Sequence, residues 1–175
     1  MKMNLSKEKN QNNPKITVGI PVFNGEKSIR RTLDSVLSQT FLDFELVISD
    51  NASTDSTSLI CQEYKKNDKR IRYIRNEKNI GGIANFKLLL DESKTEYFVW
   101  LAADDYWDPT FLEKNLPILE KNLNIICSAS QVKYFGNNID YWKKRSVHGP
   151  FRIFRKIIKR FQNLQNYSTS GTFES

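Results

Sequence analysis

Short apolar runs alternate with amphipathic segments along this chain, and that alternation restricts its fold more than any other feature. The apolar runs have the length of buried strands, and the segments between them repeat apolar residues at helical spacing. The expected strands cover residues 15–20, 44–48, 71–74 and 97–103, with a further one at 125–134. The expected helices cover 28–37, a segment around 59–64, a segment that starts at Gly81-Gly82, and 109–121, with Pro117 as a candidate kink. This order predicts an α/β fold with a mainly parallel sheet and helices on both faces.

Two adjacent acids, Asp104 and Asp105, follow directly after the most apolar of the expected strands. Ligands of open α/β sheets bind at the carboxyl ends of the strands, so the pair is expected at that edge. Carboxylate oxygens there can hold a divalent cation that bridges the phosphates of a nucleotide. Asp108 is expected to cap the helix that Pro109 opens.

Two other loops are expected at the same edge of the sheet. Phe23 could stack on a base, and Asn24 could bond a ribose or a base edge. Asp50 could accept a hydrogen bond from a base, although the polar loop that follows it, with Ser53 and Asp55, is also typical of simple helix capping.

A glycine-rich turn, Asn79-Ile80-Gly81-Gly82, could turn backbone amides toward a phosphate. It lacks the Gly-Lys-Ser/Thr of a phosphate-binding P-loop, and no G-x-G-x-x-G follows the first strand. A nucleotidyltransferase would need a basic, glycine-rich loop after that strand, which residues 21–26 do not provide.

The formal net charge of +7 belongs to one late segment. Eight basic residues and no acid lie between 143 and 160, while the first 142 residues carry no net charge. This distribution argues against nucleic acid as a partner for the fold as a whole. Residues 151–161 are expected to form a basic amphipathic helix that either contacts an anionic membrane surface or packs on other protein. Its apolar stripe consists of Phe151, Phe154, Ile157, Ile158 and Phe161.

Three regions are expected: a disordered lead-in at 1–14, an α/β domain at 15–135 and the basic segment at 136–175. The sequence has no apolar run long enough to span a membrane and no apolar leader, so a cytoplasmic protein is expected, peripheral at most to the inner face of the membrane. Cys61 and Cys127 are expected to be reduced thiols, and His148 a solvated loop residue.

Taken together, four motifs resemble the glycosyltransferases of family 2, which have the GT-A fold. The motifs are Ile16-Thr17-Val18-Gly19-Ile20-Pro21-Val22-Phe23-Asn24-Gly25-Glu26, Asp50-Asn51-Ala52-Ser53-Thr54-Asp55, Asn79-Ile80-Gly81-Gly82-Ile83-Ala84-Asn85-Phe86 and Ala103-Asp104-Asp105-Tyr106-Trp107. They occur in the order and spacing of that family, and the resemblance covers residues 15–135.

The resemblance implies transfer of a sugar, with inversion, from a nucleotide-diphosphate donor to a glycan, lipid-linked or cell-surface acceptor. It implies that Asp105 and Asp104 hold Mg²⁺ or Mn²⁺ in a DXD-type motif. The donor-binding residues are then expected to be Pro21, Phe23, Asn24, Glu26, Asp50, Asn79, Gly81 and Asp104.

The chain departs from the family pattern in two ways. Where many members carry an arginine after the third motif, this sequence reads Ala84-Asn85-Phe86. Inversion also needs a general base, and no carboxylate after Asp108 has a convincing context: the four are Glu113, Glu120, Asp140 and Glu174. The sequence therefore predicts the donor-binding part of such an enzyme, truncated as the acceptor region begins. The alternative is a catalytically silent donor-binding or partner-binding module.

Overall fold

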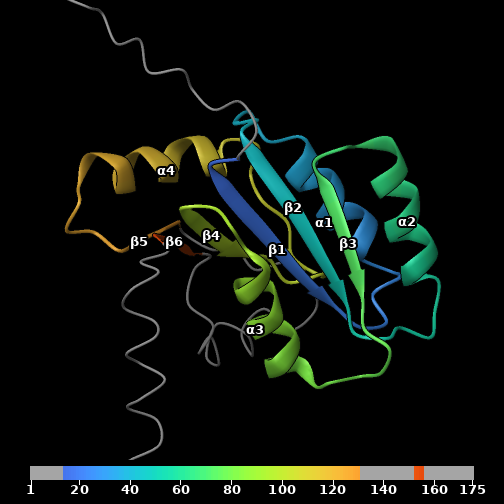
Figure 1. The fold of residues 1–175 in the computed structure, drawn as a ribbon. Coiled ribbons are helices and arrows are strands. Elements are labelled where there is room, and N and C mark those ends of the chain that lie inside the picture. Colours follow the sequence, from blue (N-terminus) through green and yellow to red (C-terminus); the bar gives the residue numbers. More distant parts are fainter. Residues whose placement is uncertain (1–13, 131–151, 156–175) are drawn as a thin grey trace, which may run out of the picture.

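A computed structural model describes residues 14–130 and 152–155 of the chain (Figure 1). The described helices are α1 (Ile29–Leu37), α2 (Thr57–Asn67), α3 (Gly82–Glu92) and α4 (Phe111–Lys121). The described strands are β1 (Ile16–Val22), β2 (Phe44–Asp50), β3 (Ile71–Arg75), β4 (Tyr97–Trp100), β5 (Cys127–Ala129) and β6 (Arg152–Arg155).

These strands form one sheet in the order β3-β2-β1-β4-β6-β5. The first four pair in parallel, and β6 runs antiparallel to both β4 and β5. The chain moves outward from β1 to β2 and β3, then returns to the other side of β1 with β4. The predicted α/β fold with a mainly parallel sheet is confirmed.

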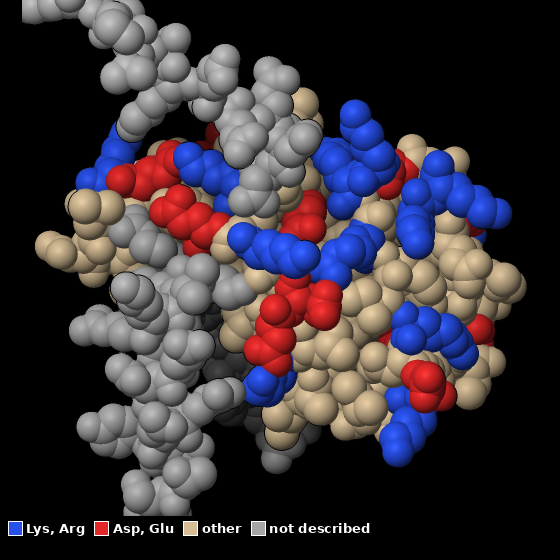
Figure 2. Space-filling view, viewed as in Figure 1, with Lys and Arg blue, Asp and Glu red and all other residues tan. Residues whose placement is uncertain are grey.

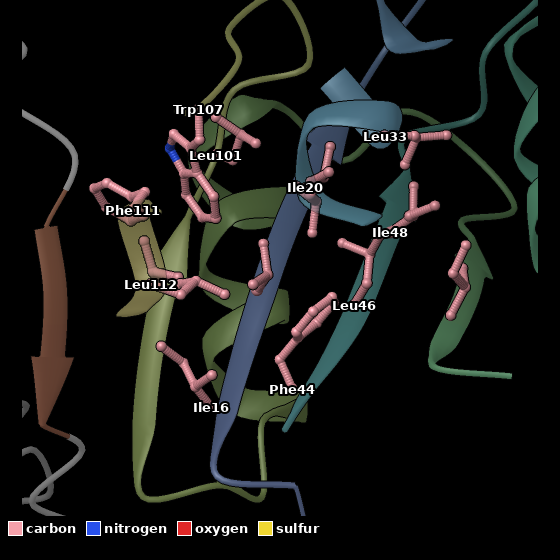
Figure 3. Close-up of a cluster of buried hydrophobic side chains, with 14 of the residues drawn as sticks. Ile16, Ile20, Leu33, Phe44, Leu46, Ile48, Leu101, Trp107, Phe111 and Leu112 are labelled. Carbon is pink, nitrogen blue, oxygen red and sulfur yellow. The ribbon is translucent and has the colours of Figure 1, made fainter. Parts of the chain in front are cut away.

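Helices cover both faces of the sheet, as predicted (Figure 1). Alternate residues of β1, including Ile16, Val18 and Ile20, point to the main core, where α1, α2 and α4 pack (Figure 3). On the opposite face of the sheet, Val47 of β2 and Phe98 of β4 pack with Leu89 of α3 in a second, smaller core. Strands buried on both faces read as continuous apolar runs, which is why these segments stand out in the sequence.

Gly19 allows α3 to approach β1 closely. A Cβ atom at this position would lie 2.8 Å from Cζ of Phe98 and 3.2 Å from Cβ of Leu89. The first of these contacts is shorter than packed carbon atoms adopt, and the second is tighter than most of them. The missing side chain of Gly19 therefore sets the distance between α3 and the sheet.

The helix predicted over 151–161 is wrong where the structure describes the chain, because residues 152–155 form strand β6. This strand lies between β4 and β5 and pairs with both, and the Ile153 side chain is fully buried in the main core. Backbone hydrogen bonds to two neighbouring strands outweigh a local helical pattern in so short a segment. The predicted membrane contact depended on a continuous helix, and β6 removes the first turn of it.

Other element boundaries differ by a few residues. β4 ends at Trp100 rather than Ala103, and within the described residues β5 spans only Cys127–Ala129. α4 begins at Phe111, two residues after Pro109, and continues through Pro117.

Residues 1–13, 131–151 and 156–175 are outside the described residues. The predicted lead-in and most of the basic segment, with His148, Asp140 and Glu174, fall there. Within the described part of the chain, no helix combines the length and the apolar character needed to cross a membrane. On the face drawn in Figure 2, acidic and basic side chains are interspersed rather than gathered by sign.

Candidate functional site

The carboxyl ends of β1 to β4 lie at one edge of the sheet, and a polar loop follows each of them. Val22 pairs with Asp50, and Asp50 pairs with Arg75, so the first three loops start side by side. β4 lies on the opposite side of β1, which makes the β1–β4 boundary the point where the strand order reverses. Open α/β sheets bind ligands at such a point, because adjacent loops there diverge to opposite faces of the sheet.

Pro21 ends the hydrogen bonding between β1 and β4. The carbonyl of Gly19 accepts a hydrogen bond from the N–H of Leu101, and the paired register of the two strands ends at Gly19 and Trp100. Alternate residues of a strand turn their backbone groups to opposite neighbours, so Pro21 faces the same side as Gly19 but has no N–H to donate. Pro21 is buried in β1.

The loop after β1 is joined to the loop after β2 by reciprocal hydrogen bonds. The side-chain oxygen of Asn24 accepts one from the N–H of Thr54 (2.8 Å), while the N–H of Asn24 donates to Oγ of Ser53 (2.9 Å). Two residues on, the carboxylate of Glu26 accepts from the N–H of Ser56, and its own N–H donates to Asp55. Asn24 and Glu26, both predicted to bind the donor, thus use their side chains to fix these two loops together.

Asp55 also accepts hydrogen bonds from the first residue of α2, as the capping interpretation predicts. Its Oδ1 accepts hydrogen bonds from the N–H and the hydroxyl of Thr57. Partial burial raises the pKa of Asp55, but the hydrogen bonds from Thr57 and Glu26 outweigh it and hold that pKa below its usual value.

Asp50 is fully buried at the end of β2, and three groups donate hydrogen bonds to its carboxylate. Oδ1 accepts from the N–H of Ser53 (2.8 Å), and Oδ2 accepts from the hydroxyl of Tyr73 (2.7 Å) and from Arg75 (2.9 Å). Arg75 also donates to the carbonyl of Ser53 (2.9 Å). A carboxylate has about four lone-pair sites, so Oδ1 keeps one for a further donor, and the half-exposed Arg75 is the part of this cluster that water reaches.

The loop after β3 is held by a network of asparagine side chains. Oδ1 of Asn79 accepts from the side chain of Asn51 and from the N–H of Gly81, both at 2.8 Å. Asn51 accepts in turn from the N–H of Ile80 and from Asn76. Gly81 has a φ of +85°, which favours glycine, and it precedes the first residue of α3. The network therefore fixes the amino-terminal end of α3 at the carboxyl edge.

The fourth loop, residues 101–110, carries the acid pair and is called here the acid-pair loop. Asp104 and Asp105 are both exposed. Behind them, the hydroxyl of Thr32 in α1 lies 2.9 Å from the carbonyl oxygen of Ala103 and 2.8 Å from that of Asp105. A Cβ on Gly25 would lie 3.8 Å from Cβ of Ala103, so the acid-pair loop lies beside the loop after β1.

Further along this loop, Asp108 accepts hydrogen bonds from the N–H and the hydroxyl of Thr110. The carbonyl of Asp108 accepts from the N–H of Phe111, the first residue of α4. The prediction that Asp108 caps the helix is therefore wrong in detail: α4 begins at Phe111 after Thr110, and the Asp108 side chain closes the turn that precedes it.

The acid pair fits a divalent cation that completes its coordination with substrate. Mg²⁺ is commonly held by one or two carboxylates together with substrate phosphates, and carboxylate oxygens suit Mn²⁺ equally. Within residues 14–130 and 152–155, no group of three or more His, Cys, Asp or Glu residues is placed to hold a metal ion. Water and the phosphate oxygens of a bound nucleotide would complete such a coordination.

Several residues at this edge escaped sequence reasoning. Thr32 reads as one polar position in a helix, and Arg75 as one charge at the end of a strand. Asn51 and Asn76 suggest polar loops and Asn85 lies in α3, but the sequence does not reveal that Asn76 donates to both of the others. A usable signal existed for α1: Thr32, Ser35 and Gln39 recur at helical spacing beside its apolar stripe.

The sequence model of the family described as "Glycosyl transferase family 2" matches residues 17–174. The chain belongs to glycosyl transferase family 2. An uncharacterized glycosyltransferase of Haemophilus influenzae is 32% identical over 123 residues, which cover 70% of this chain and 38% of that protein. The putative teichuronic acid biosynthesis glycosyltransferase TuaG of Bacillus subtilis is 35% identical over 106 residues, covering 61% of this chain and 42% of TuaG.

Solved structures show the same fold at low sequence identity. S. aureus TarS 1-349 in complex with UDP superimposes with a TM-score of 0.68 at 23% identity, covering 85% of this chain and 49% of that one. The mannosyltransferase PcManGT from Pyrobaculum calidifontis, in complex with GDP-Man and Mn2+, gives a TM-score of 0.68 at 21% identity, with 85% and 47% covered. This family 2 chain thus spans about half the length of the solved structures, and the GT-A expectation is confirmed for the fold.

Proposed function

We propose that this chain binds a nucleotide-diphosphate sugar at the carboxyl edge of its sheet and forms the donor-binding part of an inverting glycosyltransferase. One observation carries the proposal: the exposed acid pair lies at the point where the strand order reverses, beside the loop after β1. The acceptor would be a glycan, a lipid-linked precursor or a cell-surface polymer. TuaG, whose name assigns it to teichuronic acid biosynthesis, supports a polymer of the cell surface.

The acid pair is proposed to hold Mg²⁺ or Mn²⁺ through Asp105 and Asp104. A cation bound there would neutralise negative charge on the diphosphate as the bond to the sugar breaks. The residues of the chain supply the two carboxylates and hold their backbone in one conformation. The Mn2+ and GDP-Man in the PcManGT structure support a metal-dependent donor site in this fold.

The nucleoside is proposed to lie over the first two loops. Phe23 is 49% exposed and offers a ring face for stacking on the base. Because the Asp50 side chain is fully buried, its contact with the base is proposed to pass through Arg75, which is bonded to it and is 43% exposed. Pro21, Asn24 and Glu26 would then border the nucleotide mainly through the backbone of the loop that they shape. Asn79 and Gly81 are proposed to face the donor from the third loop.

A second candidate function is donor binding without transfer, and it also has an observation in its favour. Among the described residues after Asp108, the carboxylates are Glu113 and Glu120, and both already have partners. Glu113 accepts a hydrogen bond from Thr40 (2.6 Å), and Glu120 pairs with Lys15 at the start of β1. Neither carboxylate is therefore assigned as the general base that inversion needs, which favours binding without transfer.

Calorimetric titration of the full chain with UDP and with GDP, in Mn²⁺ or in EDTA, tests donor binding. We expect one of the nucleotides to bind, and to bind more tightly in Mn²⁺. The gain in nucleotide affinity in Mn²⁺ over that in EDTA is called here the Mn²⁺ effect. The Asp105→Asn variant should lose it because an amide is a weak cation ligand. Asp91→Asn is the matched control, since Asp91 is an exposed acid of α3 paired with Lys87.

The proposal fails if neither nucleotide binds with or without metal, or if Asp105→Asn keeps the full Mn²⁺ effect. Assays of sugar release and sugar transfer from UDP- and GDP-sugars then separate the two candidates. Turnover supports a transferase, whereas tight binding without release supports the silent module.

A further inference from the structure

Helix α1 turns three polar side chains toward the acid-pair loop. Thr32, Ser35 and Gln39 are spaced by three and four residues, so they follow one side of the helix and its carboxyl end. We call them the α1 polar stripe. Thr32 and Gln39 are buried, and a buried polar side chain is costly unless its hydrogen bonds are made.

Each member of the α1 polar stripe bonds to the backbone of the acid-pair loop or of the helix that follows. The Oγ of Ser35 accepts from the N–H of Trp107 (3.2 Å). The amide of Gln39 donates to the carbonyl of Asp108 (2.7 Å) and accepts from the N–H of Leu112 (3.0 Å). The stripe therefore supports the loop from residue 103 to the first turn of α4.

Thr32 makes the contact nearest to the acids. Its single hydroxyl proton is shared mainly by the carbonyl oxygens of Ala103 and Asp105, while that of Ser28 in its own helix turn is farther away, at 3.5 Å. The first two carbonyls lie on either side of Asp104, and both turn inward to α1. With the backbone on both sides of Asp104 directed inward, the side chains of the acid pair remain exposed at the edge of the sheet.

The same helix is continuous with the loop after β1. The carbonyl of Gly25 accepts hydrogen bonds from the N–H groups of Ser28 and Ile29, where α1 begins. One rigid helix therefore connects the loop that carries Phe23 and Asn24 with the loop that carries the acid pair. Helix α1 therefore fixes the separation of the two loops that a bound donor would contact.

We propose that Thr32 is a positioning residue for divalent-cation binding, acting through the backbone on either side of Asp104. This inference rests on the proposed function and names a support of the same site. Residues behind metal ligands orient them, and their loss typically lowers metal affinity by roughly 10- to 100-fold. Thr32 touches neither the nucleotide nor the cation in this assignment.

The test compares Thr32→Val, which removes the hydroxyl at nearly constant shape, with Thr32→Ser, which keeps it. Thr17→Val is the matched control: Thr17 is equally buried, but its hydroxyl bonds Glu45 at the opposite end of β1. For each full-length variant, nucleotide affinity is measured in Mn²⁺ and in EDTA, and amide hydrogen exchange is measured across residues 101–110.

We expect Thr32→Val to reduce the Mn²⁺ effect by roughly tenfold, with affinity in EDTA unchanged and exchange faster only in the acid-pair loop. Thr32→Ser and Thr17→Val should behave as the unmodified chain. The inference is overturned if Thr32→Val keeps the Mn²⁺ effect, or if it weakens binding equally in EDTA, which would indicate a general structural role. If the unmodified chain shows no Mn²⁺ effect at all, the proposed metal site fails and this inference fails with it.

Discussion

Arg75 donates a hydrogen bond to the buried carboxylate of Asp50 over 2.9 Å, and it is the exposed member of this ion pair. The side chain of Asp50 is 0% exposed, whereas that of Arg75 is 43% exposed. The neighbouring Tyr73 hydroxyl and the charge of Asp50 hold the pKa of Arg75 above its usual value. The negative charge of the buried Asp50 is therefore balanced by a side chain that solvent reaches.

Replacing Arg75 by methionine should destabilise the fold, because a buried carboxylate would lose its counter-charge. We expect the free energy of unfolding to fall by more than in the control below, but by less than for a fully buried pair, because water reaches the arginine. Arg72→Met on the same strand is the control: its pair with Glu92 is exposed on both sides and should contribute at most about 1 kcal/mol. Urea unfolding measures both, and equal losses would contradict the special role of Arg75.

Asn24 combines a left-handed backbone with a side-chain link between two loops, and two substitutions separate these contributions. Its φ is 52°, and its side chain accepts the hydrogen bond from Thr54. Asn24→Gly should cost about 1 kcal/mol for the lost link. Asn24→Ala should cost about 1 kcal/mol more, because alanine is strained at positive φ. If alanine is tolerated as well as glycine in thermal unfolding, the backbone at this position is not held as described.

Asp55 should make the stability of the chain depend on pH in the acidic range. Its pKa is lowered in the folded state, so its contribution is fully present above the pKa of about 3.8 that is usual for an unfolded aspartate. The contribution is lost as the pH falls through the lower, folded value. The unmodified chain should thus be more stable than Asp55→Asn at pH 7, and the difference should shrink below pH 4. A difference that stays constant with pH would exclude the charge as its origin.

Two glycine-to-alanine substitutions should have opposite effects on stability. Gly19→Ala would force a Cβ to within 2.8 Å of Phe98, and such overpacking costs about 1–3 kcal/mol. Gly82→Ala meets no atom within 4 Å at the start of α3, and it should stabilise the chain by about 0.4–1 kcal/mol by restricting the unfolded state. Differential scanning calorimetry of both variants checks the signs; a neutral Gly19→Ala would show that α3 can shift away from the sheet.

The parallel strands could be predicted because their apolar character is local and continuous. β1, β2 and β4 are largely buried, so each appears in the sequence as a mainly apolar run. The loops could be predicted because each follows such a run. β6 could not: four residues with two arginines have no strand pattern of their own, and the segment becomes a strand only when β4 and β5 supply partners.

The roles of the site residues were harder to predict than their positions. Sequence reasoning brings Asn24, Asp50 and Asp105 to one edge, and the structure does the same. It could not reveal that Asn24 accepts a hydrogen bond from Thr54, or that the Asp50 carboxylate is already held by Tyr73 and Arg75. Such contacts join residues 23 to 30 positions apart, and no local pattern records them.

The sequence by itself determined the alternation of strands and helices, the edge at which the polar loops gather and the exposed acid pair after β4. These follow from short-range rules, namely the period of apolar side chains and the residues that end a strand. Only the tertiary structure decided which side chains support the site and which remain open to a ligand. Thr32 and Asp105 are 73 positions apart, and they meet because α1 packs against the same core as β4, where burial requires each polar group to find a partner.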